Sequence, residues 1–433
     1  MSRKNIFILW ILLTGTNIFL AFNQHSHSPR YTYHSELWAD RAGYFVYLPA
    51  TFKHGFDPHN FTQGIDSLTG KGFILDTEHR RLITKYTYGV ALLQAPVYLI
   101  AHVIAGMTKA DANSFGAVDH AVVNITGPLF GMWGLWLLFL VLKERFSLKI
   151  SLLSVCMIYL GTNLFYYTVA DPGMSHVYSF FLFTLLLYLI RALSLSNLAS
   201  IQTWVFIGFA AGLITVIRPT NAIFLLIAPL VYRLISGNRL SYKDLPRRKI
   251  GTGLFLAFGA VVVIWLPQTI YWSYAYGTPL KWSYENEGFT NWRSPQLLEF
   301  WFAPKNGLFP YTPMVLLMFM GVYGLWNKGH RQYGVAAIAS FLIISYLGAS
   351  WWAWHFGCGF GSRSLVEYWA VFALAIASFL EFSSREWGWK LTISVLVLLA
   401  VHQLKMVYSY DGCWHNETWD WQTYLQLLFG PTK

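Results

Sequence analysis

Apolar residues are grouped in long runs along this chain, and short polar or charged segments separate the runs. The runs cover residues 6–22, 120–142, 150–168, 174–194, 202–217, 219–235, 251–272, 311–327, 333–350, 365–382 and 389–408. Several approach the roughly 20 residues that a helix needs to cross a bilayer. The pattern therefore predicts an all-α polytopic membrane protein with about eleven transmembrane helices.

One further apolar segment, residues 86–106, contains Gly89 and Pro96 and ends in a polar stretch. If it stays on the outer side as a re-entrant or interfacial helix, the inner loops collect a large excess of Lys and Arg, and the outer loops hold nearly all acids. The positive-inside rule favours this topology, with a cytoplasmic N-terminus. If the segment crossed instead, every later loop would be inverted and the basic cluster 243–249 would lie outside.

This topology divides the chain into three parts. They are a first transmembrane module, 1–235, with the outer loop 23–119; further helices, 236–408, with outer loops 274–310 and 350–364; and a short outer tail, 409–433. Tryptophan and tyrosine crowd the outer loops, which is typical of an interfacial belt that anchors a protein in lipid. Contact with a substrate is the alternative interpretation of these aromatic residues.

Composition agrees with a membrane protein. Of the 433 residues, 55% are hydrophobic and only 12% are charged, whereas a soluble domain carries about 25% charge. An ordinary soluble enzyme is thereby excluded. The formal net charge of +11 follows from the inner loops, so we expect no nucleic-acid partner.

The cysteines and histidines predict no metal site. Cys156, Cys358 and Cys413 lack metal-ligand spacing, and so do the histidines of the first outer loop. A bridge between Cys358 and Cys413 can form if both lie outside. No cofactor is indicated, although the need for a divalent cation is left open.

Three acids on the outer side are candidate catalytic residues: Glu36, Asp40 and Asp171. Glu36 and Asp40 lie four residues apart and can share one helix face. A carboxylate at the mouth of a membrane cavity suits a general base. As an alternative, Asp40 caps the helix 41–47, and Asp171, which precedes Pro172 and a span, is an N-cap as well.

Three cations on the same side are candidate ligands for a phosphate: Lys85, Arg218 and Arg363. Lys85 opens the segment 86–106, where a buried lysine needs an anionic partner, unless it snorkels to the head groups. Arg218 occupies a tight turn between two spans and can clamp a phosphate, or anchor the chain at the interface. Arg363 follows a glycine-rich stretch, and a local salt bridge to Glu367 is its competing explanation.

Four further residues, which lie within a few positions of these charged groups in the sequence, are candidate substrate-binding residues: Tyr44, Tyr88, His176 and His355.

Taken in this order, the motifs resemble those of the C superfamily of membrane glycosyltransferases (GT-C), over roughly residues 5–235. Asp40, in Asp40-Arg41-Ala42-Gly43-Tyr44, is similar to the acid that follows the first span in that family. Lys85, Asp171 and Arg218 are similar to its later lysine, second-loop acid and loop cation. The stretch Gly359-Phe360-Gly361-Ser362-Arg363 resembles the late Gly-x-Arg-Tyr segments of bacterial members.

The resemblance implies transfer of a sugar from a polyprenyl-phosphate carrier to a hydroxyl of a glycan, lipid or protein acceptor, at the outer, periplasmic face of the inner membrane. Lys85, Arg218 and Arg363 would hold the phosphate, and Asp171 would orient the acceptor or a cation. Asp40 would be the base of an inverting step. Because Arg41 stands where the mannosyltransferases have the second acid of an Asp-Glu pair, Glu36 remains an alternative base.

Two other classes compete with a glycosyltransferase. A transporter or flippase of a lipid-linked saccharide would carry ionisable residues at mid-membrane and often inverted repeats. The spans here are almost free of charge, and the sequence contains no repeat. A scaffold subunit would have no need for acids and cations gathered on one side.

Overall fold

The structure, a computed structural model, describes residues 3–108, 113–236, 246–285, 287–385, 388–413 and 419–431. Within these ranges, seven helices are long and apolar enough to cross a membrane: α1 (Arg3–His25), α5 (Gly89–Thr108), α6 (Ala117–Leu142), α9 (Ser175–Leu195), α12 (Arg247–Tyr276), α16 (Arg331–Ser350) and α18 (Trp389–Ser409). Five shorter apolar helices accompany them: α7 (Leu148–Leu160), α10 (Ile201–Ile217), α11 (Ala222–Ser236), α15 (Val315–Asn327) and α17 (Trp369–Arg385). The expectation of an all-α polytopic membrane protein is confirmed.

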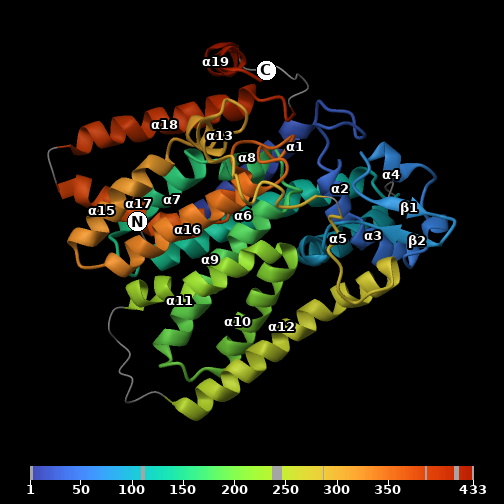
Figure 1. The fold of residues 1–433 in the computed structure, drawn as a ribbon, viewed down its shortest axis with the longest axis horizontal. Coiled ribbons are helices and arrows are strands. Elements are labelled where there is room, and N and C mark those ends of the chain that lie inside the picture. Colours follow the sequence, from blue (N-terminus) through green and yellow to red (C-terminus); the bar gives the residue numbers. More distant parts are fainter. Residues whose placement is uncertain are drawn as a thin grey trace.

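The remaining elements are short and lie mostly in the connections between these helices. They are α2 (Asp40–Phe45), α3 (Tyr47–Pro49), η1 (Ala50–His54), η2 (Pro58–Asn60), α4 (Ile65–Leu68), β1 (Ile74–Asp76), β2 (Arg81–Ile83), α8 (Leu164–Val169), η3 (Pro219–Asn221), α13 (Leu297–Phe302), α14 (Leu308–Tyr311), η5 (Arg363–Leu365) and α19 (Trp421–Phe429). Figure 1 shows the first outer loop, with β1 and β2, at one end of the helix bundle, and α12 as a long helix along its edge.

One predicted span differs in detail from the structure. The run 150–168 is broken into α7 and α8, and Gly161 is the residue at which α7 ends. The segment 86–106 forms α5, one continuous helix of 20 residues with Pro96 inside it. Its length and hydropathy also suffice for a span, and its re-entrant or interfacial placement stays a prediction.

The core lies between α6, α9 and α17. Residues 369–377 of α17 are all completely buried, whereas only 17% of the apolar window of α1 and 22% of that of α12 are buried. The apolar surface left on these two outer helices suits contact with lipid tails. The protein therefore packs α17 in the centre and leaves α1 and α12 outside.

Charged side chains join several helix ends at the end of the bundle away from the first outer loop. Arg145 Nη2 lies 2.7 Å from His330 Nε2, Arg191 donates to Glu144 at 2.5 Å, and Lys328 donates to Glu381 at 2.6 Å. These contacts bring together the loops that the sequence predicts to be cytoplasmic. The cluster 243–249, on which that prediction also rested, lies partly outside the described residues.

The first outer loop has a small core of its own, which the sequence did not predict. β1 and β2 form an antiparallel hairpin with Ile74 opposite Ile83, and Phe73 stacks on Phe115 at 5.3 Å. The Thr84 amide donates to the Tyr271 hydroxyl of α12 at 2.7 Å. This bond fixes the end of the hairpin on the helix bundle, one residue before Lys85.

Candidate active site

Asp40 begins α2 and lines the main cavity of the molecule. Ala39 before it has a φ of 48°, which residues other than glycine rarely adopt, and its amide donates to Thr69 O at 2.8 Å. The next turn of α2, residues 42–45, is buried. The chain thus turns sharply at Ala39 and presents Asp40 to the cavity with 34% of its side chain exposed.

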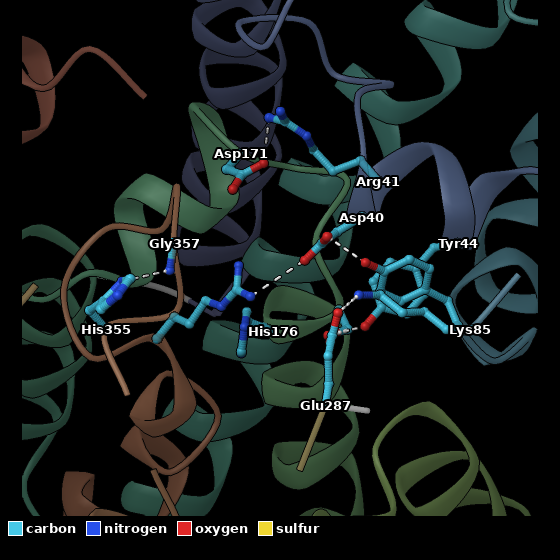
Figure 2. A network of polar contacts seen from close by, with 12 residues as sticks. Asp40, Arg41, Tyr44, Lys85, Asp171, His176, Glu287, His355 and Gly357 are labelled. Atoms are coloured by element: carbon cyan, nitrogen blue, oxygen red, sulfur yellow. Dashed lines mark hydrogen bonds and ion pairs between the residues drawn. The ribbon is translucent and has the colours of Figure 1, made fainter. Parts of the chain in front are cut away.

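Both carboxylate oxygens of Asp40 have partners (Figure 2). The Tyr86 hydroxyl donates to Oδ1, and Arg363 Nη2 donates to Oδ2 at 3.4 Å. Burial acts to raise the pKa of Asp40, but the charge of Arg363 and the hydrogen bond from Tyr86 outweigh it and hold this pKa below its ordinary value. Asp40 is therefore ionised at neutral pH, as a general base must be.

Asp171 lies beside Asp40 and forms an ion pair with Arg41. Arg41 Nη1 donates to Asp171 Oδ1 at 2.8 Å, and Arg41 Nη2 donates to Tyr33 O at 2.9 Å. Asp171 caps no helix, because α9 begins only at Ser175 and has no side-chain cap. Its buried carboxylate instead fixes the guanidinium that follows Asp40.

Lys85 enters the cavity from the end of the β-hairpin segment. Its ammonium donates to Glu287 Oε1 at 2.6 Å and lies over the rings of Tyr86 and Tyr284, 5.6 and 5.4 Å from their centroids. About a third of each charged side chain is exposed. Lys85 is thus held at the cavity surface by a carboxylate and two aromatic rings.

Arg218 ends α10 and reaches a buried acid on the far side of the cavity. Its Nη1 lies 2.9 Å from His176 Nδ1 and 3.6 Å from Glu367 Oε1. Glu367 is buried, and its Oε2 lies 3.0 Å from His176 Nδ1. Glu367 therefore pairs with Arg218 and His176 and leaves Arg363 to Asp40, so the local Arg363–Glu367 bridge does not form.

The cavity has a volume of about 810 Å³. Of the described residues that line it, five are basic and four are acidic: Arg41, Lys85, Arg218, Lys281 and Arg363, and Asp40, Asp171, Glu287 and Glu367. Each of the three cations predicted to hold a phosphate thus has one carboxylate partner. A further anion entering the cavity would compete with these carboxylates.

Eight of the ten predicted site residues line this one cavity: Asp40, Asp171, Lys85, Arg218, Arg363, Tyr44, His176 and His355. Tyr44 donates to Ser175 Oγ at 3.2 Å. His355 accepts from the Gly357 amide at 3.1 Å, and burial together with the nearby Lys305 and Arg363 lowers its pKa to about 4. His355 is therefore neutral at pH 7.

The structure does not bring Glu36 or Tyr88 to the cavity. Glu36 is buried in a separate network, in which its Oε2 lies 2.7 Å from His120 Nδ1 and its Oε1 accepts from Asn124. The Tyr88 hydroxyl donates to Ile264 O of α12 at 2.5 Å. Of the two alternative bases, only Asp40 is positioned to meet a ligand.

Several residues of this site escaped the sequence analysis. Glu287 and Tyr284 lie in the loop that follows α12, and Tyr86 directly follows Lys85. The one available signal was the need of Lys85 for an anionic partner, and Glu287 now meets that need. The sequence alone does not show which acid pairs with Lys85, because that pairing depends on how distant loops pack in the fold.

A divalent cation has no evident ligand set here. Within the described residues, no three His, Cys, Asp or Glu side chains gather as metal ligands. Asp40 and Asp171 are each occupied by a guanidinium, from Arg363 and Arg41. The residues present therefore do not fit a metal ion between the two carboxylates.

A disulfide joins Cys358 to Cys413, as the sequence allowed. It ties the loop that carries His355 to the end of α18, and the Tyr410 hydroxyl donates to Gly359 O at 2.7 Å beside it. The loop that leads to Arg363 is thus fixed at both the bridge and the helix.

No protein-family profile and no curated protein matches this chain. Solved structures, in contrast, do match it. The archaeal oligosaccharyltransferase AglB from Archaeoglobus fulgidus, determined in complex with an inhibitory peptide and a dolichol-phosphate, aligns with a TM-score of 0.54 and 13% identity. The alignment covers 100% of this chain and 61% of that protein. An Archaeoglobus fulgidus oligosaccharyltransferase in complex with Zn and sulfate aligns with a TM-score of 0.46 and 14% identity, over 98% and 57% of the two chains.

The first alignment shows that this chain shares its fold with the archaeal oligosaccharyltransferase. The expected resemblance is thus confirmed at the level of the fold. This chain spans about three fifths of the length of the archaeal protein.

Proposed function

We propose that this protein is an integral membrane glycosyltransferase, which moves a sugar from a polyprenyl-phosphate donor to an acceptor hydroxyl at the outer, periplasmic face of the cell membrane. The observation that supports the proposal best is the geometry around Asp40. An ionised carboxylate faces the same cavity as Lys85, Arg218 and Arg363. A base and a set of cations in one cavity suit an acceptor hydroxyl and a phosphate leaving group.

In the proposed reaction, Asp40 takes the proton of the acceptor hydroxyl while its oxygen attacks the anomeric carbon of the donor. The bond between that carbon and the phosphate oxygen breaks, and the polyprenyl phosphate leaves with both electrons. One displacement inverts the anomeric configuration. The phosphate leaves as an anion, so no protein acid has to protonate it.

Lys85, Arg218 and Arg363 are the proposed ligands of the phosphate. Guanidinium and ammonium groups stabilise the charge that grows on a leaving phosphate, and the three groups belong to separate parts of the chain that meet at the cavity. Asp171 acts through Arg41 as a positioning residue. The dolichol-phosphate in the archaeal structure supports a lipid-phosphate carrier.

The test is transfer of radiolabelled sugar in membranes loaded with polyprenyl-phosphate-linked hexoses and pentoses. We expect Asp40→Asn to lose transfer by about 10²-fold or more, because general-base catalysis contributes about that much. Asp57→Asn is the matched control, since Asp57 belongs to the same outer loop but pairs with Arg80 and does not line the cavity.

Full transfer by Asp40→Asn at equal protein level would overturn the assignment of the base. If the wild type transfers sugar from no donor but moves the donor between leaflets, the proposal of a glycosyltransferase is replaced by that of a flippase of a lipid-linked saccharide.

A further inference from the structure

Two outer loops form an aromatic wall on the cavity. One loop, residues 277–296, follows α12, and the other, residues 351–362, follows α16. We define the aromatic wall as Trp282, Tyr284, Phe289, Trp351 and Trp352, all of which line the cavity.

Backbone hydrogen bonds hold the first loop against the end of α16 and the start of the second loop. The Trp352 amide donates to Gly288 O at 2.9 Å, the Asn291 amide donates to Ser350 O at 3.1 Å, and the Gln296 amide donates to Ala349 O at 3.0 Å. Backbone groups that already pair within a protein are not free to bind an extended chain. What the wall offers to a ligand is therefore mainly its rings.

Four of the five rings of the wall pack against one another. Phe289 and Tyr284 pack on Trp351 with centroids at 5.1 and 5.9 Å, and Trp282 lies 5.8 Å from Tyr284. The Trp282 indole N–H donates to Glu287 O at 3.1 Å. Trp282 and Trp352 nevertheless keep 51% of their surface exposed. A large apolar ring left open on a rigid support marks a binding surface.

The wall is joined directly to the charged part of the cavity. Ser283 Oγ donates to Lys85 O at 2.6 Å, and Glu287 pairs with Lys85 Nζ at 2.6 Å. His355, neutral at pH 7, also lines the cavity. Exposed rings with hydroxyl, carboxylate and imidazole groups beside them are therefore next to the proposed site of transfer.

We propose that the aromatic wall is the acceptor subsite and that the acceptor is a saccharide, whose ring lies against Trp282 and Trp352. The proposal rests on the proposed glycosyl transfer. A sugar ring has an apolar face of C–H groups that packs on an indole ring, and an edge of hydroxyls that needs polar partners. Ser283, Glu287 and His355 supply such partners.

The surroundings disfavour other acceptors. A peptide bound along the wall would need backbone partners, and the amides of Asn291, Gln296 and Trp352 are already paired within the protein. A lipid tail would need an apolar groove between helices, but the wall belongs to two loops and is interrupted by polar side chains. A peptide and a hydroxyl-bearing lipid are therefore the alternative outcomes of the test.

The first experiment measures binding of soluble disaccharides (of mannose, glucose, galactose and arabinose) to the full chain in lipid nanodiscs. We expect at least one of them to bind, and Trp352→Ala and Trp282→Ala to weaken that binding about tenfold, from lost stacking and buried area. Trp352→Phe should keep most of the affinity because it keeps an aromatic face. The control is Trp421→Ala, since Trp421 has the same exposure on α19 but does not line the cavity.

The second experiment separates this inference from the proposed function. Asp40→Asn should bind the disaccharide like the wild type yet fail to glycosylate it, while Trp352→Ala should raise the KM for the disaccharide and leave that for the donor unchanged. Three results would each overturn the saccharide subsite. No disaccharide binds the wild type, Trp352→Ala changes only the KM for the donor, or transfer occurs only to a peptide or a lipid. If the wild type binds a disaccharide but transfers no sugar to any acceptor, the subsite is supported and the proposed glycosyl transfer is rejected.

Discussion

Asp40 accepts a hydrogen bond from Tyr86 and forms an ion pair with Arg363, so its pKa depends on both neighbours. A donor phosphate would compete with Asp40 for Arg363. We expect the pKa of Asp40 to rise when Arg363 turns to the phosphate, because the carboxylate then loses its main positive neighbour. The same donor binding would free Oδ2 for the acceptor proton.

Tyr86→Phe tests the hydrogen bond to this base. The bond helps to lower the pKa of Asp40, so its loss should raise that pKa. Activity needs the ionised carboxylate and is lost as the pH falls through the pKa; the acid limb of kcat/KM should therefore lie at higher pH in the variant. Tyr88→Phe is the control, since it also loses a hydrogen bond but does not line the cavity. An unchanged acid limb would contradict the role of Tyr86.

Arg218 has a structural role as the cation beside Glu367 and a proposed chemical role as a ligand of the phosphate. Two variants can separate these roles. Arg218→Gln leaves the buried Glu367 carboxylate without its cation, which should cost about 1–3 kcal/mol of unfolding free energy. Arg218→Gln with Glu367→Gln should recover much of that stability but not the donor affinity. Thermal unfolding in detergent and the donor KM measure the two effects. Recovery of both by the double variant would show that Arg218 does not bind the donor.

Much of the charged site is visible in the sequence. Acids and cations outside apolar runs are conspicuous in a chain with so few charges, and eight of the ten predicted residues line one cavity. The pairing of these charges is not visible, because it depends on helix ends distant in the chain. The burial of Glu36 could not be predicted for the same reason, since its partners His120 and Asn124 come from α6.

At the scale of elements, α2 lies so close to its neighbours that it accepts only glycine at Gly43. A Cβ there would overlap the Tyr86 ring and the carbonyl of Gly72. The position of Asp40 one turn earlier thus depends on the absence of a side chain at this residue.

Gly43→Ala should displace α2 from Tyr86 and reduce transfer at least tenfold, about the loss that a small misplacement of a catalytic group produces. The control is Gly15→Ala in α1, where nothing lies within 4 Å of the added methyl. Equal loss in both variants, or full activity of Gly43→Ala at wild-type protein level, would contradict the dependence on this contact.

Most helices could be predicted from apolar runs alone, because a membrane helix must be apolar over its length. The break at Gly161, between α7 and α8, was not predicted, because the segments on both sides of it are apolar. The β-hairpin was missed because its strands have only three residues each, too few for a periodic pattern.

At the scale of the whole molecule, α2, which carries Asp40, lies with β1 and β2 on one side of the helix bundle, and α15 lies on the opposite side (Figure 1). We predict that, in a background with Cys156→Ser, Trp292→Cys reacts with a membrane-impermeant maleimide on intact cells. Arg331→Cys should react only after permeabilisation, because the positive-inside rule places its loop in the cytoplasm. The reverse labelling would place the cavity on the cytoplasmic side.

The disulfide between Cys358 and Cys413 connects the cavity to the redox state of its compartment. Such bonds form and persist where the surroundings are oxidising, and this one fixes the loop of the aromatic wall that leads to Arg363. Membrane insertion alone would then leave the protein immature. Its host must also oxidise two thiols, so a strain without thiol oxidases should accumulate inserted but poorly active protein.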